Sequence, residues 1–104
     1  MSDLVRLAVE WWRLKSALGE TAPAPARHAV RRIEDFLHHR EIEVQALDGR
    51  RYDPGLPIRV IDAIDDDHLP AGESVISETL SPLILWRGNV IQNADVVTRR
   101  GTMG

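Results

Sequence analysis

Apolar side chains recur at helical spacing near the start of the chain, and Gly19 follows where a C-terminal helix cap belongs. The apolar positions are Leu4, Leu7, Ala8, Trp11, Leu14 and Leu18. Val5 and Trp12 widen this stripe beyond what one modest core requires. The pattern predicts a helix over residues 4–18. It either lies on its own domain with one tryptophan half exposed, or is also covered by a second copy of the chain. We favour the second arrangement, because a small chain has little else to cover both rings.

A second amphipathic segment follows a break. Residues 19–26 read GETAPAPA, in which two prolines interrupt any helix, although Pro25 could occupy the first turn of the next one. Residues 27–40 place apolar side chains on one face and charged ones opposite. The apolar set is Ala29, Val30, Ile33, Phe36 and Leu37. The two segments predict a helical hairpin, which needs a β-domain or a partner to complete its core.

The hydrophobic period changes after His39. Ile42, Val44 and Ala46 alternate with polar residues, which is typical of a strand, and residues 47–57 are rich in turn formers. Further candidate strands are residues 58–64, 74–80, 83–86 and 90–98, the last interrupted near Asn93. We expect residues 99–104 to fray. The predicted fold is α+β, with a helical hairpin over residues 1–41 followed by a small antiparallel β-domain over residues 42–104.

Composition and charge exclude several classes of function and cellular location. The 104 residues include 13 basic and 16 acidic side chains, a net charge of −3, and no cysteine. The arginine pairs are scattered among acidic neighbours, which argues against a nucleic-acid surface. Thiolate metal sites and cysteine nucleophiles are excluded. No apolar run approaches the length of a membrane span, and the first residues lack the features of a signal peptide, so a cytoplasmic protein is expected.

No catalytic or nucleotide-binding motif occurs in the sequence. Gly72-Glu73-Ser74 lacks the closing glycine of a nucleophile elbow, and neither GxxxxGK[ST] nor GxGxxG is present. His38 and His39 fall at the C-terminal end of a predicted helix, where the helix dipole favours a cation. We therefore expect a protein that is not an enzyme, has no cofactor and binds no small-molecule substrate.

The stretch IDAIDDDHLPAGE, residues 61–73, is the densest group of titratable side chains. A metal-dependent hydrolase could be built there on Asp62, Asp66, Asp67 and His68. The consecutive carboxylates at 65–67 should diverge, and the spacing does not match a calcium loop. We expect a solvated loop between two strands, with a partner-binding role as a lesser alternative and no metal.

Several motifs in the second half carry a resemblance to a known family. They are Tyr52-Asp53-Pro54, then Asp66, Pro70 and Gly72, then Ser77-Glu78-Thr79-Leu80, and finally Trp86-Arg87-Gly88-Asn89-Val90-Ile91 with Ala94 and Val96-Val97. Together with the order of the predicted elements, they resemble GrpE, the nucleotide exchange factor of DnaK-type heat-shock chaperones. The resemblance covers about residues 1–98 and is densest over residues 49–98. The family's long N-terminal helix has no counterpart in this sequence.

The resemblance implies a homodimeric co-chaperone of protein folding and the stress response. It would bind the ATPase domain of a DnaK-type chaperone and promote ADP release. The implied partner-binding residues are Tyr52, Pro54, Gly55, Arg87, Gly88, Asn89 and Thr98. The residues expected in the dimer interface are Leu4, Leu7, Trp11, Trp12, Leu14 and Leu18.

The sequence departs from the family at the last hairpin. Asn89 occupies the position of the family's arginine, and Arg87 lies on the other side of Gly88. Turn chemistry alone explains the residue types at Pro54 and Gly88. The alternative function is therefore a GrpE-like dimeric adaptor or interaction module in another multi-protein complex, which does not act on nucleotide exchange.

Overall fold

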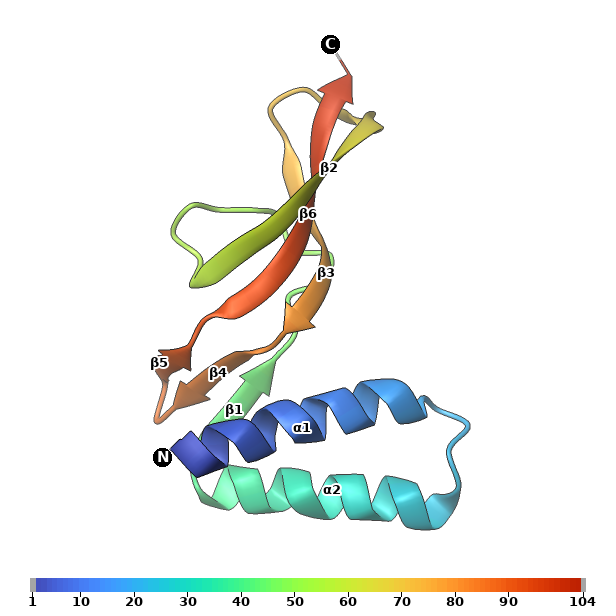
Figure 1. The fold of residues 1–104 in the computed structure, drawn as a ribbon, viewed down its shortest axis with the longest axis vertical. Coiled ribbons are helices and arrows are strands. Elements are labelled where there is room, and N and C mark those ends of the chain that lie inside the picture. The colour runs from blue at the N-terminus through green and yellow to red at the C-terminus, as the bar shows by residue number, and fades with distance from the viewer. Residues whose placement is uncertain (1, 104) are drawn as a thin grey trace. The chain divides into compact units, whose positions relative to one another are not determined.

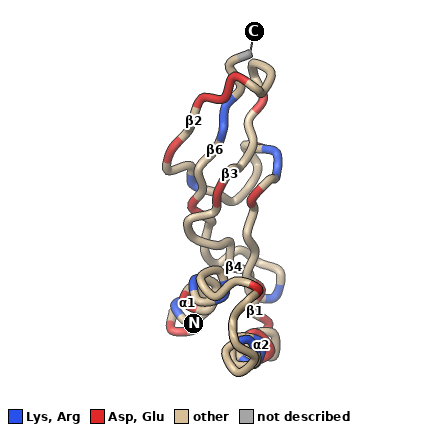
Figure 2. The backbone as a smooth tube through the Cα atoms, turned by 90° about the vertical axis from the view of Figure 1, so that its right-hand side faces the viewer, with Lys and Arg blue, Asp and Glu red and all other residues tan. Residues whose placement is uncertain are grey.

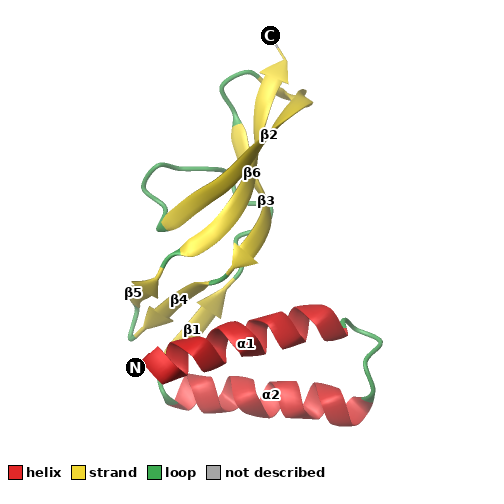
Figure 3. Cartoon of the chain, in the orientation of Figure 1, coloured by secondary structure: helices red, strands yellow, loops and turns green. Residues whose placement is uncertain are grey.

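The computed structural model describes residues 2–103 and contains two helices followed by six strands (Figures 1 and 3). The helices are α1 (Ser2–Leu18) and α2 (Ala24–His39). The strands are β1 (Ile42–Gln45), β2 (Ile58–Pro70), β3 (Ser74–Ser81), β4 (Leu83–Trp86), β5 (Asn89–Gln92) and β6 (Ala94–Met103). The fold class is α+β, as predicted: two packed N-terminal helices precede two small sheets.

The chain forms two compact units. The first combines Met1–Val44 with Ile84–Ile91, and the second combines Gln45–Leu83 with Gln92–Gly104. The sequence pattern placed a boundary near residue 41, between the helices and all strands. In the structure the turn between β4 and β5 belongs with the helices, because β4 and β5 complete a three-stranded sheet of order β1-β4-β5.

The core of the first unit joins both helices to β1 and β4. Its buried side chains are Ala8, Trp11, Val30, Leu37, Ile42 and Ile84. The indole N–H of Trp11 donates to the carbonyl oxygen of Val30 at 2.9 Å, so the largest buried ring also has its polar atom satisfied. The helical spacing on α1 and α2 thus supplies one face each to a shared core.

Helix α2 begins three residues before the predicted start. Pro23 has φ −57° and ψ 149° and precedes the helix. Pro25 lies in the first helical turn, where the backbone amide that a proline lacks would have no partner within the helix. The carbonyl of Pro23 accepts the amides of Ala26 and Arg27, so the predicted break is confined to residues 19–23. Within residues 2–103 neither helix has the length and hydrophobicity needed to cross a membrane.

The second unit contains a sheet of order β2-β6-β3, with β6 in the centre. Strand β3 pairs with β6 antiparallel, as predicted, but β2 pairs with β6 in parallel, from Ile58 opposite Ala94 to Asp66 opposite Gly101. The expectation of a purely antiparallel β-domain is therefore wrong. A parallel pair needs a long connection between its strands, and residues 71–93 provide it.

The acidic stretch lies in a strand, which corrects the expectation of a loop. Strand β2 continues from Ile58 through Asp65, Asp66, Asp67 and His68 to Pro70, and only Ala71–Glu73 separate it from β3. Strand β6 likewise extends to Met103, where fraying was expected, and Gly104 lies outside the described residues. Each strand gives the other a hydrogen-bonding partner beyond the apolar segment that the sequence pattern identified.

Candidate partner-binding surface

The turn between β4 and β5 consists of Arg87 and Gly88, with φ values of 51° and 79°. Two successive positive φ values are typical of the type I′ turn that best matches the twist of a two-stranded hairpin. Gly88 adopts this conformation without steric cost, whereas the Cβ of Arg87 crowds its own backbone at a cost of about 1–2 kcal/mol. The hairpin thus holds Arg87 in a conformation that its residue type disfavours.

Glu41 is the other non-glycine residue with positive φ in the described chain, at 61°. It follows the end of α2, where a left-handed residue commonly terminates a helix, and its amide donates to the carbonyl of His38 at 2.9 Å. Arg87 binds this residue twice. Its backbone amide donates to the Glu41 carbonyl at 3.0 Å, and its Nε donates to Oε2 at 2.6 Å. The hairpin tip is therefore attached to the end of α2.

The guanidinium group of Arg87 also packs on an aromatic ring. It lies 4.6 Å from the centroid of the Trp86 ring, within the range of a cation–π contact. The Arg87 side chain is still 62% exposed. An arginine that is fixed from two sides loses less conformational entropy on binding, and arginine and tryptophan are enriched among the residues that dominate protein interfaces. Arg87, Gly88 and Asn89 together form an exposed tip in which the arginine is held by Glu41 and Trp86.

The predicted residues Tyr52, Pro54 and Gly55 lie in one surface loop of the second unit. The Asp53 side chain accepts the Gly55 amide at 2.9 Å, and the Asp53 carbonyl accepts the Leu56 amide at 2.9 Å. This side-chain-to-backbone bond is the usual way in which an aspartate shapes a turn. All three predicted residues are exposed, so the loop is available to a partner.

Thr98, the last predicted binding residue, is buried. It lies in β6 between Ala63 of β2 and Ile76 of β3, and only 5% of its surface is exposed. Because its side chain belongs to the interior of the second unit, it cannot contact a partner directly. Its structural role is to fill the covered face of the sheet beside Ile76.

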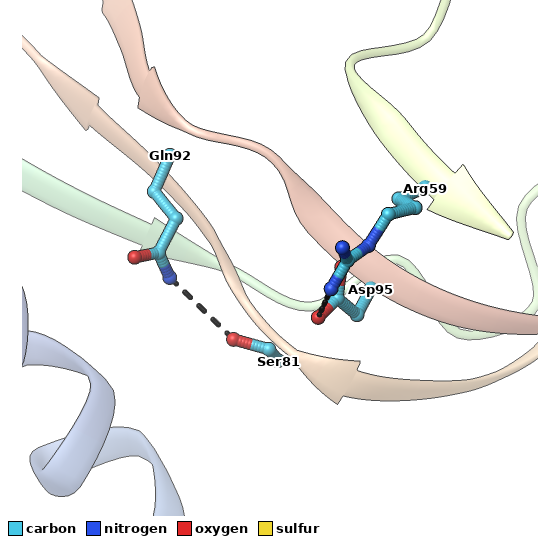
Figure 4. A network of polar contacts seen from close by, with 4 residues as sticks. All are labelled: Arg59, Ser81, Gln92 and Asp95. Atoms are coloured by element: carbon cyan, nitrogen blue, oxygen red, sulfur yellow. Dashed lines mark hydrogen bonds and ion pairs between the residues drawn. The ribbon is translucent and has the colours of Figure 1, made fainter. Parts of the chain in front are cut away.

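A polar network that no sequence motif indicated lies where β2 and β6 begin and where β3 and β5 end (Figure 4). Arg59 binds Asp95 in bidentate fashion, with both nitrogen–oxygen distances 3.0 Å, and the Asp95 carboxylate raises the pKa of the Arg59 guanidinium. Gln92 contacts Ser81 at 3.4 Å. With Asn93 these residues line an open hollow of about 380 Å³. The parallel register brings Arg59 opposite Asp95, so the pair becomes visible only in the sheet.

Asp66, Asp67 and His68 lie closer together than their spacing suggested. One potential ligand atom from each lies within 4.8 Å of the others, whereas divergent side chains were expected. Asp66 already accepts the His68 amide at 2.8 Å, and an Asp66 oxygen lies 3.7 Å from Arg99. The amide bond lowers the pKa of Asp66, and the His68 ring and Arg99 add smaller contributions. The Asp66 carboxylate is therefore already bound by protein donors.

The six α1 residues expected in a dimer interface fall into two groups. Trp11 is buried in its own unit and is 6% exposed, so it is not an exposed anchor. Leu4, Trp12 and Leu18 are half-buried, and Trp12 and Leu18 pack against the core. Leu7 and Leu14 are 38% and 43% exposed, two helical turns apart on one side of α1. These two leucines are the exposed members of the predicted interface.

Comparisons with known proteins add no evidence on the family. No protein-family model matches the chain, and no curated protein matches it. The resemblance to GrpE therefore stays a prediction that rests on the motifs of the sequence, and the function is argued from the residues described above.

Proposed function

We propose that this chain is a GrpE-like nucleotide exchange factor, a cytoplasmic co-chaperone that binds the ATPase domain of a DnaK-type chaperone and promotes ADP release. In this proposal the protein breaks no bond and needs no cofactor. Its work is to bind one conformation of a partner. The proposal rests on the motifs shared with the family and is supported by the order of elements, in which two packed helices precede the strands.

The single observation that carries the proposal is the hairpin tip. The resemblance places the family's contact residues at the turn around Gly88, and Arg87 in that turn is exposed, charged and held by Glu41 and Trp86. A partner that meets this tip does not have to order a flexible arginine, which lowers the entropic cost of binding. The resemblance also implies contacts at Tyr52, Pro54 and Gly55, which are exposed in their own unit.

The mechanism follows from linkage. A protein that binds the open form of the chaperone's nucleotide cleft more tightly than the closed form shifts the equilibrium towards the open form. The same preference must weaken nucleotide by an equal factor. A 100-fold loss of ADP affinity requires about 2.7 kcal/mol of preference, which a few well-ordered contacts can supply.

We further propose a homodimer that forms through the helices. Leu7 and Leu14 leave an apolar stripe on α1 that its own unit does not cover. Two hairpins that pack these stripes together would form a four-helix bundle with a buried seam. Trp11 would support this interface only indirectly, since its ring already fills the core of its own unit.

The test is the release of a fluorescent ADP analogue from a DnaK-type chaperone encoded by the same organism. We expect the protein to accelerate release in a saturable manner. Arg87→Asn removes the charge but keeps a residue that suits a type I′ turn, so this variant should fold and fail to accelerate release. Release at the spontaneous rate in saturating wild-type protein would overturn the proposal.

A dimeric adaptor in another multi-protein complex is the second candidate. Two observations favour it: Asn89 stands where the family has an arginine, and the charge of Arg87 is already balanced by Glu41. An adaptor would bind its partner without preferring the open cleft. Unchanged ADP release from the chaperone at saturating protein would therefore favour the adaptor and exclude the exchange factor.

A further inference from the structure

The two edges of the sheet in the second unit differ: the β3 edge is covered and the β2 edge is open. Along β3 the outer edge is covered by residues 49–52: Gly49 donates to the carbonyl of Ile76, the Ile76 amide donates to Arg50, and Tyr52 donates to Ser74. Strand β2 forms the other edge, and no strand among residues 2–103 pairs with its outer side. This open edge is 13 residues long.

An open edge of this length normally attracts other strands. Strand β2 exposes three large apolar side chains, Val60, Ile61 and Ile64, each between 41% and 49% accessible. Unpaired amides and carbonyls beside exposed apolar residues offer a template on which another extended chain can add. The chain must therefore either cover this edge or make it a poor template.

Hydrogen bonds within β2 and its entry make the edge a poor template. The Ile58 amide donates to the Leu56 carbonyl at 2.8 Å. The Ala63 amide donates to the Asp62 carboxylate at 2.9 Å, and the His68 amide donates to the Asp66 carboxylate at 2.8 Å. These donors are already satisfied, so an incoming strand would have to break a local bond at each of them.

Irregular register adds to this effect. The pairing of β2 with β6 shifts between Val60 and Asp62 and again between Asp66 and Pro70. The capped amides of Ala63 and His68 therefore lie beside or within the irregular segments of the strand. Irregularities of this kind bend or twist an edge and prevent long continuous pairing with another chain.

The same aspartates charge the edge. Among the described ion pairs, Asp65 binds Arg100 at 2.9 Å and Asp66 contacts Arg99 and His68, whereas Asp62 and Asp67 meet no cation. Figure 2 shows the acidic segments along β2 and the basic segment on the neighbouring β6. A second β2 strand laid along this edge would bring another set of carboxylates into a row that is already negative.

We propose that Asp62 and Asp66 protect the edge of β2 against strand-to-strand association of this chain. Each carboxylate accepts the amide of a β2 residue, and Asp62, which meets no cation among the described ion pairs, also adds negative charge to the edge. The acidic stretch therefore keeps a long edge strand open without cost to solubility, and the inference does not depend on the proposed exchange activity. If the proposed helix-mediated dimer forms, a second pairing at β2 would produce open-ended chains.

The test uses three variants at concentrations from about 10 μM to about 1 mM. Asp62→Ala with Asp66→Ala removes both the acceptors and the charges. Asp62→Lys with Asp66→Lys removes the acceptors but keeps a charged edge, a device that also protects natural edge strands. Asp53→Ala is the control, because it removes an aspartate that caps an amide in a loop away from the edge. Light scattering reports mass, and amide hydrogen exchange locates the interface.

We expect the alanine pair to increase in apparent mass at least about twofold with concentration, with slowed exchange over residues 58–68. The lysine pair should increase in mass less than the alanine pair, because its charges still repel a second strand although its acceptors are lost, and Asp53→Ala should behave like the wild-type protein. If the alanine pair does not fold, Asp62→Ala alone serves the same purpose with a smaller increase. A folded alanine variant whose mass stays at the wild-type value, or one whose protected amides lie outside β2, would overturn the proposal.

Discussion

Arg87 and Glu41 each have a positive φ value, and they bind each other through both a backbone and a side-chain hydrogen bond. Each conformation costs a non-glycine residue about 1–2 kcal/mol. An ion pair with side chains more than half exposed returns less than about 1 kcal/mol. The pair therefore does not stabilise the fold on balance, and residues held in such conformations cluster at binding sites.

Arg87→Asn tests whether the arginine serves binding or folding. Asparagine before glycine is the preferred type I′ sequence, so the strain at this position should fall while the ion pair is lost. We expect the free energy of unfolding to stay within about 1 kcal/mol of the wild-type value or to rise. Urea denaturation checks stability, and the acceleration of ADP release from the chaperone checks binding. A loss of stability without a loss of activity would assign the arginine a structural role.

Asn89→Arg is the complementary change. It restores an arginine where the resembled family has one, at an exposed position that follows the turn. If the proposed function is correct, the variant should accelerate ADP release more than the wild-type protein does. The increase should not exceed about 150-fold, the upper end of the usual coupling between two ligands. Asn89→Gln, which keeps an uncharged amide, is the matched control. Equal rates for both variants would show that this position does not contact the chaperone.

The helices and the positions of most strands could be predicted from the sequence. The apolar period of residues 4–18 and 27–40 reports which faces are buried, and the two helices meet in one core. The extent of β2 could not be predicted in this way. Consecutive aspartates do not alternate with apolar residues, and an exposed edge strand tolerates charge on both faces, so the usual period is absent.

In the candidate site, the sequence predicted only the residues whose type is set by a local turn. Gly88 and Pro54 mark turns, and both lie in turns. The burial of Thr98 and the pairing of Arg59 with Asp95 depend on the parallel register of β2 and β6. A period-two pattern cannot reveal whether a strand runs parallel or antiparallel to its neighbour, so these contacts required the three-dimensional arrangement.

The two groups of α1 residues predict different effects of mutation. Trp11→Ala should destabilise the fold by about 3–5 kcal/mol, because it empties a buried site and removes the indole hydrogen bond to the Val30 carbonyl. Leu7→Ala with Leu14→Ala should change the stability of the monomer little and weaken the proposed dimer. Thermal denaturation and sedimentation equilibrium separate the two effects. A wild-type protein that sediments as a monomer would contradict the dimer.

The lowered pKa of Asp66 predicts a contribution to acid stability. Its folded pKa is below its unfolded pKa, so the carboxylate stabilises the fold above the unfolded value of about 3.9 and loses this effect as pH falls through the folded pKa. Asp66→Asn should therefore reduce the dependence of unfolding free energy on pH in this acid range. Urea titrations at several pH values measure it. Asp67→Asn is the control, since Asp67 accepts no hydrogen bond within the described residues.

We predict that β6 does not tolerate a side chain at Gly101. Its amide donates to the Glu73 carbonyl at 2.8 Å, and a Cβ at this residue would overlap the backbone carbonyl of Pro70. Backbone atoms cannot move aside as a flexible side chain can, so Gly101→Ala should destabilise the fold by about 1–3 kcal/mol. Gly55→Ala is the matched control, because its Cβ would meet only the Asp53 side chain at 3.4 Å. Urea denaturation of both variants checks the difference. Equal stability would mean that the close approach of β2 and β6 at Gly101 is not required by the fold.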